Sequence, residues 1–301
     1  MANAWTVDNL IRRMRTRGYL PASLGLTTQQ ILDTFTDEAG LYVVSMLKSI
    51  REEFLVAEAD LAATSGDLLA IPARAAGAAL RSLSWLVSGV ATPLDRIEPE
   101  RRHLYDATGT PAGYIFHGDS VELVPASSGT VRVKYQQRPG LFVLEASCGL
   151  ISDVTSGVVT VDAFPSDFAA TEAYDFVRGT ANYGTRAIDV EPTAVDSGAR
   201  TLTFATADIP SGLAAGDFVC LAGETCLPPF PSELHQLLAL RSALAIAQGS
   251  GSSRVRDLKT ELEGEDGRGG MRKDVIALLT PRNDASARPI IRTGGPARGW
   301  W

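Results

Sequence analysis

The sequence has little that would support catalysis, secretion or membrane insertion. It contains three cysteines, three histidines, four lysines and 7% aromatic residues among its 301 positions. An odd number of cysteines without a C-x-x-C pair predicts neither a disulfide framework nor a zinc site, and a Cys220–Cys226 bridge is conceivable only as an isolated link. The longest apolar run, residues 68–91, is interrupted by Arg74 and Arg81, so it does not read as a membrane span. No signal peptide is recognisable, and we expect a protein made in the cytoplasm without membrane association.

Positive charge is also scarce. Thirty-five acidic residues against 28 basic ones give a formal net charge of −7. Proteins that hold nucleic acid tightly are usually basic, so tight or sequence-specific DNA binding is not expected. A negatively charged wall would instead let DNA pass without sticking, because like charge repels phosphate.

Recognisable catalytic and metal-binding motifs are missing. His103, His117 and His235 stand outside any zinc-hydrolase pattern, and no P-loop, nucleophile elbow or dinucleotide fingerprint occurs. We expect His117 to be a solvated histidine on the polar face of a strand. The aspartates between residues 147 and 230 are too scattered for a calcium loop. We therefore expect no enzyme, no metal and no cofactor, and an enzyme without known motifs stays as an alternative.

The first 62 residues have a helical pattern. Asp8 is a possible cap for a short basic helix, and Thr27 with Gln30 matches a capping box, S/T-x-x-E/Q. Apolar residues at spacings of three and four predict a longer helix over 37–59. Residues 1–62 are thus expected to form helices of a bundle.

Helical periodicity returns over residues 231–280. Ser232 is a plausible N-cap for a helix that Gly249 closes, and two more helices are expected over 255–265 and 271–279. We expect these helices to pack with those of the N-terminal segment into one bundle.

Between these blocks, residues 63–146 have the period of two that predicts strands. The stretch 113–125 indicates a hairpin whose Gly118-Asp119 turn begins with glycine, as a type II′ turn requires. This register pairs Phe116 with Val121 and Tyr114 with Leu123 on an apolar face. The other face is expected to be mostly polar and to carry Ile115, His117, Ser120 and Glu122.

A second strand signal in this region is the run from Thr130 to Gln137. Val131, Val133 and Tyr135 are expected inside, and the residues between them outside. Two further strands are expected within 66–72 and 81–89, which makes this region an antiparallel sheet.

Residues 147–230 have a different pattern of strands and turns. Four short strand-like segments are separated by turn residues, at 157–163, 174–179, 199–205 and 216–223. Such spacing is typical of a small sandwich or barrel inserted between the sheet and the last helices. The predicted fold class is therefore α+β, with a helical bundle, a central antiparallel sheet and an inserted small β-sandwich or barrel.

The last segment, residues 281–301, has no periodicity and is expected to be an extended arm. Four arginines against Asp284 give it a net charge of 4 − 1 = +3. Apolar residues in such an arm are a liability in water, so we expect them to anchor a partner. The predicted anchors are Arg282, Arg288, Ile290, Ile291, Arg292, Arg298, Trp300 and Trp301. The basic helix with Arg12, Arg13, Arg15 and Arg17 is either a solvated face or a contact to an acidic neighbour.

Three stretches together resemble the head-to-tail adaptor (connector) proteins of tailed bacteriophages. Residues 109–139, G-T-P-A-G-Y-I-F-H-G-D-S-V-E-L-V-P followed by V-R-V-K-Y-Q-Q-R-P, look like the central sheet of that family. The helix PSELHQLLALRSALAIAQG with the later LLTPR resembles its C-terminal helices, and residues 27–56 resemble its opening helices. The large β-insertion at 147–230 departs from the minimal adaptors.

The resemblance implies a dodecameric ring in the virion, between the portal and the next connector or tail protein. The arm would clamp the portal, and genome DNA would pass through the central channel. The hairpin's apolar face would pack on the helices or supply a subunit edge in the ring. Two other classes stay open: another neck or tail component, such as a terminator or baseplate protein, and a glycan-binding module built on the two β-regions.

Overall fold

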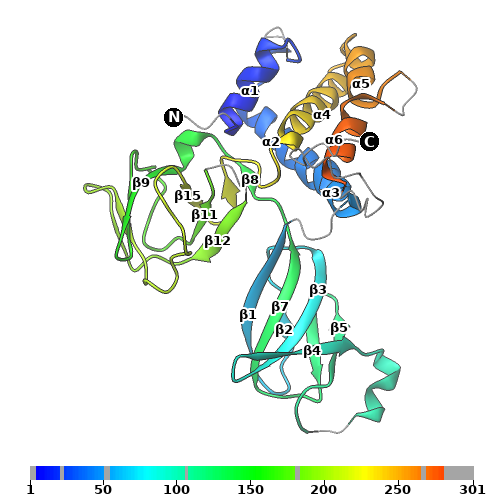
Figure 1. The fold of residues 1–301 in the computed structure, drawn as a ribbon, viewed down its shortest axis with the longest axis vertical. Helices are drawn as coiled ribbons and strands as arrows, with labels where there is room; N and C mark the ends of the chain where they lie inside the picture. The colour runs from blue at the N-terminus through cyan, green and yellow to red at the C-terminus, as the bar shows by residue number, and fades with distance from the viewer. Residues whose placement is uncertain are drawn as a thin grey trace, which may run out of the picture.

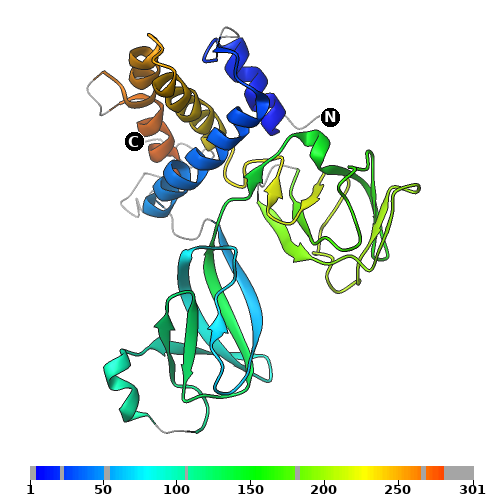
Figure 2. The same ribbon diagram turned by 180° about the vertical axis from the view of Figure 1, so that it is seen from behind.

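The fold is α+β, with helices at one end of the molecule and two β-modules extending from them (Figures 1 and 2). The computed structural model describes residues 5–20, 24–50, 55–105, 108–179, 184–265 and 269–280. We call residues 55–138 the first β-module and residues 148–222 the second β-module. Among the described helices, none is both long and apolar enough to cross a lipid bilayer.

The helices come from both ends of the chain and share one core. They are α1 (Val7–Thr16), α2 (Thr28–Glu38), the π-helical turn η2 (Ala39–Val43), α3 (Val44–Ile50), α4 (Glu233–Gly249), α5 (Val255–Glu263) and α6 (Gly270–Leu279). Helix α4 is the centre of this group, because it packs against α1, α2, α5 and α6. Its Leu237 and Leu238 meet Phe35 and Leu47 from the N-terminal helices. Burial of such leucine and phenylalanine side chains stabilises the group by roughly 1.5–3 kcal/mol each.

The helix caps predicted from the sequence are confirmed only in part. The predicted capping box is confirmed, because the Thr27 hydroxyl accepts the Gln30 N–H and the Gln30 side chain accepts the Thr27 N–H. Asp8 as a cap is wrong: Thr6 is the N-cap of α1 and accepts the Asn9 N–H, which leaves Asp8 in the first turn. Ser232 occupies the N-cap position of α4 without a side-chain capping bond.

The first β-module is one sheet that curls around its own core (Figure 1). Its strands lie in the order β1-β7-β3-β4-β5-β6-β2, and only the short β4/β5 pairing is parallel. The strands are β1 (Val56–Ala63), β2 (Leu69–Ala70), β3 (Ala75–Val87), β4 (Val90–Arg96), β5 (Gly113–His117), β6 (Ser120–Val124) and β7 (Gly129–Gln137), with the 3-10 turn η3 (Pro99–Leu104) after β4.

The helix predicted over 37–59 is wrong in its second half. Helix α3 ends at Ile50, and β1 begins at Val56 and pairs with β7 along eight residues. Alanine and glutamate favour helix, but Ala57, Ala59 and Leu61 also alternate with acidic residues. Pairing with β7 and burial in the module's core override the local preference.

The predicted hairpin is confirmed in register, with Phe116 opposite Val121 and Tyr114 opposite Leu123. Gly118 has a φ of +69°, as the first turn position requires. Ile115 corrects the expectation of a mostly polar second face, since it is 2% exposed and packs with Ile97 and Val124. The apolar face packs inside the first β-module, and the described residues of that core come from the module itself and from Ile188 in the second β-module, with none from a described helix.

Strand β7 follows the predicted alternation. Val131, Val133 and Tyr135 are buried, whereas Lys134 is exposed. Opposite them, β1 is a sheet edge whose Glu58 and Asp60 lie directly across from Lys134 and Arg132 and form ion pairs with them.

The second β-module is an antiparallel sheet in the order β12-β11-β15-β9-β10-β14-β13. Its strands cover the four predicted segments and three more: β9 (Gly149–Thr155), β10 (Val158–Val161), β11 (Tyr174–Val177), β12 (Thr185–Val190), β13 (Ala194–Asp196), β14 (Thr201–Thr203) and β15 (Phe218–Leu221). An aromatic core fills it, in which Tyr174 packs edge-on against Phe168 and Phe204.

Two short segments connect the modules to the helices. Strands β8 (Leu141–Phe142) and β16 (Glu224–Thr225) pair in parallel beside α2. The 3-10 turn η4 (Glu145–Ser147) follows β8. The chain enters and leaves the first β-module on adjacent strands, because Val56 of β1 pairs with Gln136 of β7.

Candidate functional site

The predicted portal-binding residues lie outside the part of the chain that the structure describes. This applies to Arg282, Arg288, Ile290, Ile291, Arg292, Arg298, Trp300 and Trp301. Their role therefore stays a prediction, and the described surface has to be searched for other contact sites.

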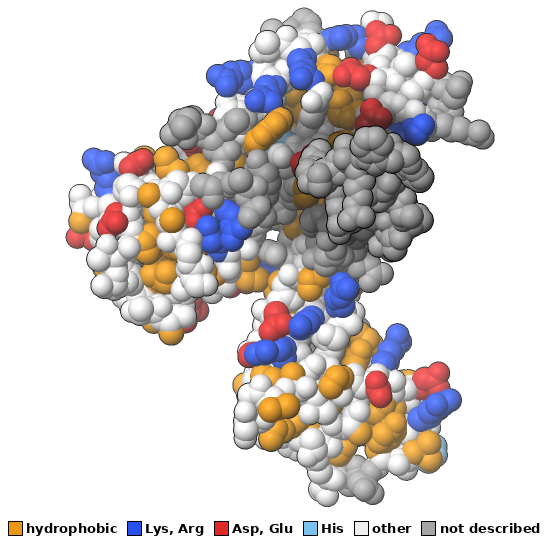
Figure 3. All heavy atoms as spheres, in the orientation of Figure 1, with side chains coloured by type: hydrophobic (Ala, Val, Ile, Leu, Met, Phe, Trp, Pro, Cys, Tyr) orange, Lys and Arg blue, Asp and Glu red, His pale blue; other side chains and the backbone are white. Residues whose placement is uncertain are grey.

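The most basic feature of the described surface is the outer side of α1. This helix buries Val7, Leu10, Ile11 and Met14 against the bundle and leaves four arginines exposed. We call Arg12, Arg13, Arg15 and Arg17 the arginine face. Figure 3 shows it as blue side chains gathered at the top of the molecule, over α1.

The side chains of the arginine face are held by neutral groups. Arg12 donates to the Asn9 side-chain oxygen at 2.6 Å, and the Arg13 guanidinium lies 4.2 Å from the centre of the Trp5 ring. Within the described part of the chain, no carboxylate pairs with any of these four arginines. Arg17 contacts the Tyr19 hydroxyl, which in turn donates to Glu261. The arginine face therefore has neutral partners but no direct ion pair among the described residues.

An acidic groove lies at the junction of α2 with β8 and β16. It encloses about 540 Å³, and its carboxylates are Asp33 and Asp37 on α2 and Glu224 on β16. We call these three residues the acidic groove. Its lining contains no lysine, arginine or histidine. Leu141, which is 59% exposed, adds apolar surface at its edge.

Among the described residues that line the acidic groove, none carries a positive charge. Asp33 and Asp37 are one helical turn apart, a spacing at which like charges repel. Burial raises the pKa of Glu224 above its ordinary value, and the charge of Asp167 raises it further. A cation bound in the groove would reduce the repulsion between Asp33 and Asp37 and would favour the charged form of Glu224.

A buried ion pair ties the two β-modules together. Arg74, in the loop between β2 and β3, donates from Nη2 to both carboxylate oxygens of Asp175 on β11, at 2.9 and 2.8 Å. The same guanidinium contacts Asp189 on β12 at 2.8 Å. We call these three residues the Arg74 clamp.

Asp175 is the buried centre of the clamp. It is 3% exposed, and it also accepts the backbone N–H groups of Asp189 and Gly223. Burial raises the pKa of Asp175, while the Asp189 N–H, the Arg74 charge and the Gly223 N–H lower it, and the balance lies above the ordinary value. Arg74 and Asp175 direct their polar groups at each other and at groups of the second β-module, so the arrangement fits a structural tie.

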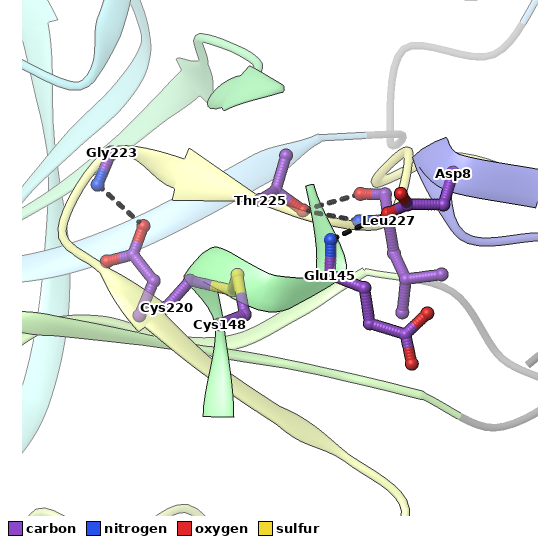
Figure 4. Close-up of a disulfide and its surroundings, with 8 residues drawn as sticks. Asp8, Glu145, Cys148, Cys220, Gly223, Thr225 and Leu227 are labelled. Carbon is purple, nitrogen blue, oxygen red and sulfur yellow. Dashed lines mark hydrogen bonds between the residues drawn. A yellow bond between two sulfur atoms is a disulfide. The ribbon is translucent and has the colours of Figure 1, made fainter. Parts of the chain in front are cut away.

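The cysteines form one buried cluster beside the groove. Cys148 and Cys220 are joined by a disulfide, and Cys226 is a buried free thiol (Figure 4). The Cys220–Cys226 link considered from the sequence is therefore wrong, because Cys220 bonds to Cys148. Figure 4 also shows the Glu145 N–H donating to Asp8, which ties α1 to η4 next to the disulfide.

These cysteines are the described residues best placed to hold a metal, because their three sulfur atoms lie within 4.8 Å of one another. Metal ligation requires thiolates. Burial raises the pKa of Cys226 well above its ordinary value, and the charge of Glu145 raises it further. The side chains around the cluster are apolar, so the site favours the disulfide over a charged metal centre.

Each histidine has a local structural partner. His103 contacts the Glu100 carbonyl, and His117 pairs with Glu122 on the exposed face of the hairpin as a solvated histidine would. His235 is buried, its Nε2–H donates to the Phe230 carbonyl, and burial lowers its pKa to about 4.

Exposed apolar side chains mark the first β-module. Val87 and Val90 flank the turn between β3 and β4 and are 52% and 68% exposed. Leu68 and Leu104, in neighbouring turns of the module, are exposed as well. Single exposed side chains of this kind are common on protein surfaces, so they define no site by themselves.

No protein-family model matches the sequence, and no match is found among curated proteins. Sequence reasoning noted the basic helix, but it missed the acidic groove and the Arg74 clamp. The acidic residues of both are scattered along the chain, and only the fold brings them together.

Proposed function

We propose that this chain is a structural protein of a tailed-bacteriophage virion, a ring-forming component of the neck. More particularly, we propose a head-to-tail adaptor, which sits between the portal and the next connector or tail protein. The ring, expected to have twelve copies, surrounds the channel through which genome DNA passes. The protein is made in the cytoplasm of the host bacterium and resides at the head-tail interface.

One observation carries this proposal more than any other: the described N-terminal and C-terminal helices share one core, from which the β-modules extend (Figure 1). The stretches that resemble adaptors, 27–56, 109–139 and the C-terminal helices, fall on the bundle and on strands β5 to β7. Helix α6 belongs to the bundle and ends at Leu279, just before the predicted arm. In the proposal, the arm reaches a neighbouring protein from this side of the bundle.

Each part has a role in this proposal. The arm anchors the portal with its arginines, isoleucines and terminal tryptophans. The second β-module is an inserted sandwich or barrel that decorates the ring or meets a tail protein. The first β-module is a rigid building element. Neither catalysis nor a cofactor is part of the proposal.

Two other classes compete with it. Another neck or tail component, such as a terminator or baseplate protein, would not need the arm for portal attachment. A glycan-binding module needs exposed aromatic side chains on a sheet face. Tyr114 and Tyr135 are buried and Phe116 packs against the module's core, which argues against that alternative.

The test is deletion of residues 282–301. We expect a folded chain with an unchanged circular dichroism spectrum that no longer co-sediments with portal rings. The matched control is Arg256→Ala, an exposed arginine on α5, which should leave portal binding unchanged. Retained portal binding by the deleted chain would remove the arm from the mechanism. In addition, cryo-electron microscopy of particles recovered through a tag should show a ring below the portal, and recovery of free monomer alone would refute the adaptor.

A further inference from the structure

The arginine face and the acidic groove are complementary in charge and are presented by different elements. The arginine face lies on the second half of α1, whereas the groove lies between α2 and the β8/β16 pair. Neither surface forms an ion pair within the described part of its own chain, and Arg17 reaches the Glu261 carboxylate indirectly, through the Tyr19 hydroxyl. Four arginines gathered on α1 and its C-cap are unusual in a protein with a net charge of −7, so their position needs an explanation.

The two surfaces do not neutralise each other within one chain. Helix α1 is about 15 Å long for its ten residues. Its first turn is the end next to the groove region, because Asp8 accepts the Glu145 N–H there. The arginines follow in the later turns and at the C-cap and are exposed, and Arg13 and Arg17 also lie beside α4, where they line a small pocket with Gln236.

We propose that the arginine face of one copy docks into the acidic groove of a second copy of this chain. Guanidinium groups on α1 would pair with Asp33, Asp37 and Glu224, and Leu141 would supply apolar contact at the groove edge. The half-buried Glu224 would gain a cation that its own chain does not provide.

Such a contact joins two different surfaces, so it is heterologous. Heterologous contacts repeat from copy to copy and close into a ring when the rotation between copies allows it. The inference rests on the proposed ring and deepens it, because it names the surfaces that join neighbouring subunits. Charged contacts of this kind chiefly set the register and rate of association.

The first test is crosslinking of the full-length chain. Arg15→Cys and Asp37→Cys are made as separate variants, mixed, and treated with a bismaleimide. We expect a crosslinked dimer only in the mixture, and its absence would overturn the inference. Arg256→Cys, an exposed arginine on α5, replaces Arg15→Cys in the matched control and should give no dimer.

The second test is charge reversal, followed by sedimentation velocity. Arg12→Glu with Arg15→Glu, or Asp33→Arg with Asp37→Arg, should each weaken self-association by at least about tenfold, and mixing the two variants should restore it. Unchanged self-association of the single-surface variants would overturn the contact. Thermal melting of each variant shows whether it is folded.

A third measurement tests whether the arginine face binds nucleic acid and not a second copy of the chain. A labelled DNA duplex is titrated with wild type and with the Arg12→Glu, Arg15→Glu variant. Binding that only wild type shows would assign the arginine face to nucleic acid and refute the docking proposal. Portal co-sedimentation of the same variants is independent of this result, so loss of the subunit contact and failure of the adaptor proposal can be told apart.

Discussion

The Arg74 clamp allows a quantitative prediction. Arg74→Ala removes the two hydrogen bonds from Nη2 to Asp175 and leaves a carboxylate that is 3% exposed without its cation. Removing one partner of a buried ion pair typically costs about 3–5 kcal/mol. Asp175 keeps two backbone N–H donors, from Asp189 and Gly223, so the lower end applies. We expect a loss of about 3 kcal/mol in the free energy of unfolding.

The matched comparison is Asp189→Asn. The Asp189 side chain is 49% exposed, so its pairing with Arg74 is screened by solvent and its loss should cost less than about 1 kcal/mol. Urea denaturation of both variants gives the free energies, and amide exchange over residues 173–190 shows where protection is lost. Adding Asp175→Asn to Arg74→Ala should recover part of the loss, because the unpaired charge is gone. Equal effects of Arg74→Ala and Asp189→Asn would refute this account of the clamp.

Two further predictions concern buried groups near the bundle. Because the folded-state pKa of His235 is lowered from 6.5 to about 4, folding excludes its proton, and stability should fall by about 3 kcal/mol between pH 7 and pH 4. His235→Gln should remove that part of the pH dependence of urea unfolding, and an unchanged slope would contradict it. The Cys148–Cys220 bond closes a 72-residue separation, so replacing both cysteines by serine should cost up to about 4 kcal/mol through loop entropy. Peptide mapping without reductant should find that pair linked and Cys226 free, and three free thiols would contradict the assignment.

Local patterns predicted the elements whose signals are short-range. The capping box at Thr27, the register of Tyr114 with Leu123 and the alternation along β7 all depend on neighbours within a few residues or one hairpin. Strand β1 was missed because its alanines and acidic residues are compatible with a helix. Only the pairing with β7, more than sixty positions later, decides the conformation.

The candidate sites depend on longer-range contacts still. The basic helix could be predicted because its arginines lie within six consecutive positions, from Arg12 to Arg17. Nothing local connects Asp37 with Glu224, Arg74 with Asp175, or Cys148 with Cys220. Each of these pairs joins two segments that lie far apart in the sequence and meet only in the folded chain.

The chain enters the first β-module on β1 and leaves it on the adjacent strand β7. This arrangement has an evolutionary consequence. Val56 and Gln136 face each other, so the module is covalently joined to the rest of the chain at two neighbouring positions, and the Arg74 clamp adds a non-covalent tie to the second β-module. A segment attached in this way is a cassette: recombination can exchange it for another of different length without disturbing the helices that hold both of its ends. Changes of loop length within this cassette are therefore expected to leave the packing around α4 undisturbed, whereas a change at Arg74 would also affect the second β-module.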